Sequence, residues 1–116
     1  MSVRVEKVAA QLRDEISAIL DQRISDPRVG LVTVIEVDLS PDLGTAKVHV
    51  STIGTDDERR ASMAALDHAR AFVRRELAAQ VRNLRRIPEI RFVDDHNMEY
   101  AIHISEVIDQ LHRDAP

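Results

Sequence analysis

The fold is decided by residues 55–88, which read TDDERRASMAALDHARAFVRRELAAQVRNLRRIP. The Thr55 hydroxyl can accept a hydrogen bond from the Glu58 amide, while the Glu58 carboxylate accepts one from the Thr55 amide. This reciprocal pattern is the capping box that begins a helix. Pro88 ends the pattern, because proline lacks an amide donor and disfavours helical dihedrals in the residue before it. The spacing therefore predicts one long helical segment between these residues.

The two sides of this predicted segment differ in chemistry. Apolar residues recur at helical spacing along one side, at Leu66, Ala69, Val73, Leu77 and Leu84. The other side carries six arginines, which are Arg70, Arg74, Arg75, Arg82, Arg85 and Arg86. We therefore expect the apolar side to pack against a core and the arginines to face solvent as a basic ridge.

The predicted segment is long for a helix in a globular domain, so we expect an interruption within it. The small side chains of Ala69 and Ala71, on either side of Arg70, make this the favoured place, because they let the chain bend or another backbone approach. The alternative is a straight helix in which the alanines serve helix propensity. The sequence alone favours the interrupted helix and the straight helix equally.

Length and composition narrow the class of protein. A chain of 116 residues fits a single domain, 1–116, with one core. The absence of cysteine excludes disulfides and thiolate metal sites, and it suits a cytoplasmic location. No apolar run is long enough for a membrane helix, and the N-terminus lacks an apolar signal segment. Aromatic residues make up only 3% of the chain, which disfavours nucleic-acid binding by base stacking.

Charge is unevenly distributed along the chain. The whole protein carries a net charge of −4, yet residues 70–91 hold seven basic and two acidic side chains. A charged helical face is often only solvated. Here the basic side chains are all arginine, whose planar guanidinium binds phosphate in a bidentate manner. We therefore favour contact between the ridge and RNA phosphates, with Arg4, Lys7 and Arg28 as weaker candidates.

The remaining patterns predict an α+β domain of two layers. Helical spacing covers residues 5–24, and period-two patterns at 31–39 and 46–51 flank a turn, which predicts an antiparallel hairpin. A short strand at 90–92 and a closing helix at 98–111 follow. The predicted order is helix, strand, strand, long helix, strand, helix. Because the third strand returns after a helical crossover, we expect a mixed three-stranded sheet with the helices on one face.

Signatures of catalysis and metal binding are weak. The three glycines are too widely spaced for a phosphate-binding loop. The five histidines include no HExxH motif or other tight pair, and each is better explained as a surface or partly packed side chain. They are His49, His68, His96, His103 and His112. Adjacent Asp94 and Asp95 are better explained as helix caps than as a catalytic pair. We predict no enzyme, no metal, no cofactor and no small-molecule substrate.

Several blocks of sequence resemble a known family when they are taken in order. They read ISDPR at 24–28, VTV at 32–34, VDLSPD at 37–42, AKVHVS at 46–51, FVR at 72–74 and PEIRFVD at 88–94. No single block is specific, but their order and spacing resemble ribosome-binding factor A from about Arg4 to Leu111.

The resemblance implies a type II KH-like fold in which an Ala-x-Gly kink replaces the GxxG loop that other KH modules use to hold RNA. GxxG is absent here, and the kink falls on Ala69 and Ala71, with Ala71 standing where the family has glycine. Segment 82–86 also has one residue more than the family before the proline.

The same resemblance implies a function. The family is non-enzymatic, binds the immature 30S subunit near the functional centre of 16S rRNA, assists late 16S rRNA maturation and is associated with cold adaptation. The leading hypothesis is therefore a monomeric ribosome assembly factor that binds rRNA. The runner-up is a small protein–protein interaction module that uses the basic helix face or a sheet edge.

Overall fold

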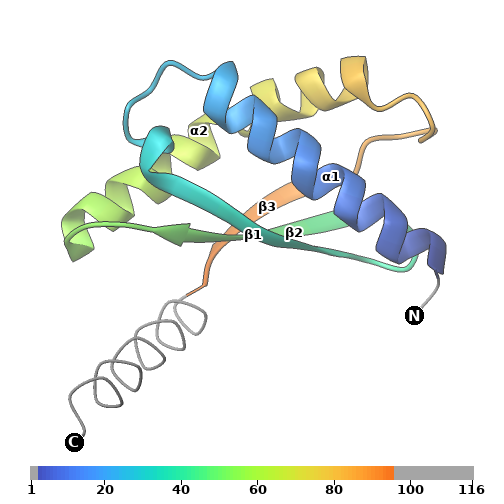
Figure 1. The fold of residues 1–116 in the computed structure, drawn as a ribbon, viewed down its shortest axis with the longest axis horizontal. Coiled ribbons are helices and arrows are strands. Elements are labelled where there is room, and N and C mark those ends of the chain that lie inside the picture. The colour runs from blue at the N-terminus through green and yellow to red at the C-terminus, as the bar shows by residue number, and fades with distance from the viewer. Residues whose placement is uncertain (1–2, 96–116) are drawn as a thin grey trace, which may run out of the picture.

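The computed structural model describes residues 3–95. Figure 1 shows their order along the chain as α1 (Val3–Gln22), η1 (Val29–Leu31), β1 (Val32–Leu39), β2 (Thr45–Thr52), α2 (Asp56–Gln80) and β3 (Glu89–Asp94). This is the predicted order as far as β3. The closing helix predicted at 98–111 lies outside the described residues.

The three strands form the predicted mixed sheet. β2 lies in the middle, antiparallel to β1 and parallel to β3. Between Val34 and Glu36 the pairing of β1 with β2 shifts, so that Val34 pairs with Val50 but Glu36 pairs with His49. Ile35 is the extra residue of a β-bulge. The sequence analysis did not predict this bulge.

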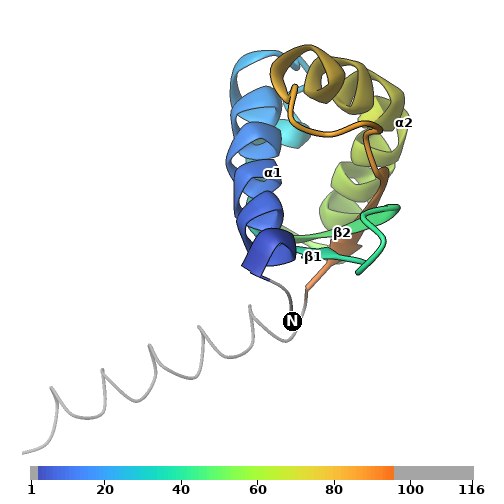
Figure 2. The same ribbon diagram turned by 90° about the vertical axis from the view of Figure 1, so that its right-hand side faces the viewer.

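Both described helices cover the same face of the sheet, as Figure 2 shows, which confirms the two-layer architecture. α1 contributes six buried apolar residues to the core, in agreement with its helical spacing: Val5, Val8, Leu12, Ile16, Ile19 and Leu20. The middle strand adds the buried Ala46, Val48 and Val50. The outward positions of the strands carry mostly polar residues. No helix among residues 3–95 covers this second face of the sheet, which we call the open face.

α2 begins at the predicted capping box. The Glu58 amide donates to the Thr55 hydroxyl at 3.2 Å, and the Thr55 amide donates to the Glu58 carboxylate at 3.1 Å. Leu66, Val73 and Leu77 are buried on the predicted apolar side. The helix continues through Ala69 and Ala71 to Gln80, so the expected interruption does not divide it into two helices. A bend of the helix axis at these alanines stays a prediction.

α2 ends well before Pro88, so the prediction of a helix that reaches this proline is wrong. Val81 has extended dihedrals (φ −106°, ψ 104°) and is buried in the core. Asn83 exchanges two side-chain hydrogen bonds, of 3.1 and 3.2 Å, with Gln11 of α1. These tertiary contacts outweigh helix propensity, and residues 81–88 form an irregular connection to β3.

Candidate RNA-binding surface

The six predicted ridge arginines lie on two different segments. Arg70, Arg74 and Arg75 are on α2, as predicted. Arg82, Arg85 and Arg86 lie in the irregular 81–88 connection, so their predicted placement on the helix is wrong. All six side chains are exposed. The basic surface is therefore built from the C-terminal half of α2 together with the connection that follows it.

Three of these arginines meet at one depression in the surface. Arg70 and Arg74 of α2 and Arg86 of the connection line a hollow of about 540 Å³. The remaining lining residues are Gly44, Ala71, Ile87, Glu89 and Ile90. We call this the arginine groove. Arg75, Arg82 and Arg85 do not line it.

Two of the groove arginines interact with nearby parts of the protein. Nη2 of Arg74 donates a hydrogen bond of 3.2 Å to the backbone carbonyl of Ile87, which ties α2 to the connection. The pKa of Asp42 lies below its ordinary value because its carboxylate accepts hydrogen bonds from the Ser40 hydroxyl and the Gly44 amide, with a smaller contribution from the positive charge of Arg86. Arg86 therefore lies on the same side of the groove as the hairpin turn that contains Gly44.

The ridge arginines differ from most other arginines of the chain in lacking acidic partners. Within residues 3–95, none of the six has a carboxylate oxygen within 4.0 Å of its guanidinium. Elsewhere, Arg23 pairs with Glu76, and Arg60 pairs with Asp57. No carboxylate in this part of the chain neutralises the ridge arginines. Their guanidinium groups can therefore donate hydrogen bonds to an external anion.

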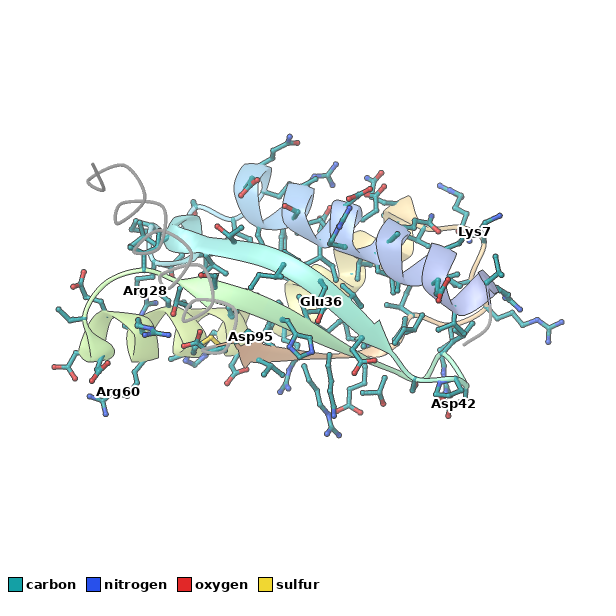
Figure 3. All side chains as sticks on the ribbon, turned by 60° about the horizontal axis from the view of Figure 1, so that its bottom comes forward. Lys7, Arg28, Glu36, Asp42, Arg60 and Asp95 are labelled. Carbon is teal, nitrogen blue, oxygen red and sulfur yellow. The ribbon has the colours of Figure 1, made fainter. Side chains whose placement is uncertain are left out.

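The weaker candidates do not join the groove. Arg4 and Lys7 are exposed on α1. The Arg28 guanidinium makes two hydrogen bonds to the Asp26 carboxylate, at 3.1 and 2.7 Å, which lower the pKa of Asp26 and raise that of Arg28. Figure 3 shows Arg28 at the opposite end of the molecule from Asp42, whose neighbour Gly44 lines the groove. Arg28 is therefore engaged within its own turn and distant from the arginine groove.

Two predicted residues outside the groove have roles that the sequence analysis missed. Asp94 is the last residue of β3, and the helix that it was expected to cap lies outside the described residues. Its carboxylate accepts a hydrogen bond of 3.1 Å from the buried Thr52 hydroxyl and lies 3.5 Å from the Arg59 guanidinium. Asp95 lies beside His49. His68 is exposed on α2, and the other three histidines lie outside the described residues.

The apolar and backbone parts of the groove could not be found from composition. Gly44 belongs to the hairpin turn, and Ile87 and Ile90 flank Pro88, which places them next to Arg70 and Arg74 only after the chain has folded. Ala71 is the exception, because the sequence analysis selected it as part of the expected kink. No helix between residues 3 and 95 is both long and apolar enough to cross a membrane.

Known proteins provide an independent comparison. The profile of the family described as Ribosome-binding factor A matches residues 4–108. The chain is 43% identical to ribosome-binding factor A of Chlorobium chlorochromatii over 117 residues, covering 100% of this chain and 93% of that protein. It is 39% identical to the Macrococcus caseolyticus protein over 114 residues, covering 98% and 99% of the two chains.

Solved structures agree with this match. The crystal structure of ribosome-binding factor A from Thermus thermophilus superposes with a TM-score of 0.68 at 30% identity, covering 78% of this chain and 94% of that chain. The solution structure of a Thermotoga maritima protein described as a putative ribosome binding factor A gives a TM-score of 0.70 at 32% identity, covering 83% and 92%. These structures share the KH-like fold. The chain therefore belongs to the ribosome-binding factor A family.

Proposed function

We propose that this protein is a cytoplasmic, monomeric ribosome assembly factor without enzymatic activity. It binds the immature 30S subunit through 16S rRNA and assists late maturation of that RNA, including during growth in the cold. A homology model of the Thermus thermophilus relative, fitted into the cryo-EM map of a 30S complex with ribosome-binding factor A, supports this choice of partner. That model superposes on the chain with a TM-score of 0.61 at 30% identity, covering 73% of this chain and 88% of that one.

The observation that carries the proposal is the convergence of Arg70, Arg74 and Arg86 on one hollow without carboxylate partners among residues 3–95. Guanidinium groups match the geometry of phosphate oxygens and form charge-assisted hydrogen bonds with them. Phosphate contacts fix the position of a protein on RNA, whereas RNA shape selects the site. The groove is therefore suited to bind phosphates of the RNA backbone.

The charge of the rest of the molecule supports one orientation on RNA. The chain has a net charge of −4, although residues 70–91 carry a net positive charge. RNA phosphates attract the basic end and repel the acidic remainder, so docking through the arginine groove has the lowest electrostatic energy. Function then follows from binding alone. The protein holds an immature rRNA conformation and dissociates once the mature conformation no longer offers the same phosphates to the groove.

Charge reversal tests the proposal. In a variant with Arg74→Glu and Arg86→Glu, we expect co-sedimentation with 30S subunits to be lost while the circular dichroism spectrum is unchanged. The matched control is a variant with Arg13→Glu and Arg60→Glu. Both arginines are exposed and lie outside the groove, and each pairs with an acidic neighbour, Arg13 with Asp14 and Arg60 with Asp57. It changes the net charge by the same amount and should retain binding.

A second candidate function is a protein interaction module. β1 is an edge strand of the sheet, and a hollow of about 420 Å³ is lined by residues of β1 and α1. An extended peptide could pair with such an edge. Equal 30S binding by the groove variant and the control would favour this alternative over the arginine groove.

A further inference from the structure

The open face of the sheet carries a polar cluster whose residues do not line the arginine groove. Glu36 of β1, His49 of β2 and Asp95, which directly follows β3, each present one possible metal-ligand atom there. These three atoms all lie within 4.8 Å of one another. Figure 3 looks onto this face and shows Glu36 and Asp95 side by side. The cluster therefore draws one residue from each strand or its immediate extension.

The β-bulge places Glu36 in this cluster. Val34 pairs with Val50, whose side chain is in the core, and in a regular strand Glu36 would share that inward side with Val34. The extra residue Ile35 reverses the alternation, so that Glu36 pairs with His49 on the open face and Val37 returns to the core. Bulges commonly serve to redirect a side chain. Here the bulge brings a carboxylate beside an imidazole.

Asp95 is held beside the same imidazole by the backbone. Its amide donates a hydrogen bond of 2.8 Å to the carbonyl of Val50, which extends the parallel pairing past the end of β3. Oδ2 of Asp95 then lies 3.3 Å from Nδ1 of His49, and the two side chains are only 15% and 21% exposed. This distance suits an ion pair if the imidazole is protonated. Even so, Nδ1 is shielded from solvent and makes no hydrogen bond within residues 3–95.

We infer that Glu36, His49 and Asp95 form a binding site for one divalent transition-metal ion of the Zn²⁺ class. One imidazole nitrogen and two carboxylate oxygens are ligands that Zn²⁺ accepts, whereas Mg²⁺ and Ca²⁺ prefer oxygen alone. Metal–ligand bonds of about 2.0–2.2 Å put tetrahedral ligand atoms roughly 3.3–3.6 Å apart. Asp95 and His49 are already 3.3 Å apart, so metal binding would require only the exposed side chain of Glu36 to move closer.

The charge of the cluster favours the same conclusion. Two carboxylate oxygens and an imidazole nitrogen are anionic or neutral electron-pair donors, as a divalent cation requires. Nδ1 of His49 is buried and makes no hydrogen bond within residues 3–95, although Oδ2 of Asp95 lies 3.3 Å away, so a bound cation between the two groups would satisfy it. The bound ion would link β1, β2 and the chain that leaves β3. Metal binding should therefore stabilise the fold by mass action.

The test is titration of the purified full chain with Zn²⁺, followed by calorimetry and by two-dimensional NMR of the backbone amides. We expect one ion per chain, a rise in the thermal unfolding midpoint, and the largest NMR shifts at the centre of β1 and β2. His49→Gln should weaken binding at least about tenfold, since removal of even an outer-shell partner of a metal ligand has this effect. His68→Gln is the matched control, because His68 is exposed on α2, and it should bind as the unchanged chain does.

Glu36→Gln keeps the test decisive if His49→Gln fails to fold, because Glu36 is exposed and its substitution leaves the core intact. This variant should also bind Zn²⁺ more weakly than the His68→Gln control. The inference is overturned if neither His49→Gln nor Glu36→Gln weakens binding, because another group then holds the ion. It is also overturned if millimolar Zn²⁺ gives no saturable binding, which would mean that His49 and Asp95 form only an ion pair.

Discussion

Substitution of Ala71 by glycine tests whether α2 is continuous where the family has its kink. Ala71 lies inside α2 and its side chain is exposed, so truncation to glycine removes no core packing. In a helix interior, glycine is less favourable than alanine by about 0.8–1.0 kcal/mol. For a domain of this size, that loss lowers the midpoint of thermal unfolding by roughly 3–6 °C. We expect Ala71→Gly to be destabilised by this amount.

A second exposed alanine of the same helix provides the control. Ala64 is also exposed within α2, and Ala64→Gly should have the same cost as Ala71→Gly. Thermal and denaturant unfolding, followed by circular dichroism, measure both variants under identical conditions. If Ala71→Gly is neutral or stabilising while Ala64→Gly is destabilising, residue 71 does not have helical dihedrals. That result would refute the continuous helix and restore the kink as the family resemblance implies it.

Three further predictions concern the core, a buried network and the hairpin turn. Leu66→Ala should lower the free energy of unfolding by about 2–5 kcal/mol in a denaturant titration, because Leu66 is fully buried. Thr52→Val should cost about 1–3 kcal/mol in the same assay, because the buried Thr52 hydroxyl accepts from Arg59 and donates to Asp94. The pKa of Asp42 in the folded state is lowered from 3.8. The ionised carboxylate therefore stabilises the fold above pH 3.8, and this contribution is lost as the pH falls through the folded-state pKa. Asp42→Asn should remove the contribution, so that the free energy of unfolding depends less on pH in this acid range when it is measured by denaturant titration at several pH values.

The sequence predicted the elements whose hydrophobic periods are strong. α1 buries the residues that its helical spacing selected, and alternation along the hairpin identified its two strands. The capping box located the start of α2 because its two hydrogen bonds are local to residues 55 and 58. Each of these features depends on residues close together in sequence, which is why it could be predicted without the rest of the fold.

Features that depend on distant residues were missed. α2 ends at Gln80 because Val81 enters the core and Asn83 bonds to Gln11, and neither contact leaves a local signal. The bulge at Ile35 does leave a local signal, because the apolar residues of β1 that pack in the core occupy even-numbered positions up to Val34 and odd-numbered positions from Val37. This shift can be interpreted only once the pairing with β2 is known.

The candidate site was predicted in composition but not in arrangement. Residues 70–86 were correctly selected as a concentration of exposed arginines. The assignment of all six arginines to one side of a single helix could not show which of them line the same groove. Arg86 lies near Arg70 and Arg74 only because the irregular connection brings it there. Histidines were judged one at a time from sequence motifs. That approach could not detect His49 between Glu36 and Asp95, which come together only across the sheet.

The salt dependence of 30S binding tests the central claim most directly. If between three and six of the exposed arginines contact phosphate, log K should fall with log salt concentration with a slope of roughly −2 to −5. Replacing both Arg74 and Arg86 by glutamine removes two groove contacts and should reduce the size of that slope by about 1.4–1.8. A slope near zero for the unchanged protein, or an identical slope for the double variant, would contradict RNA binding through the arginine groove.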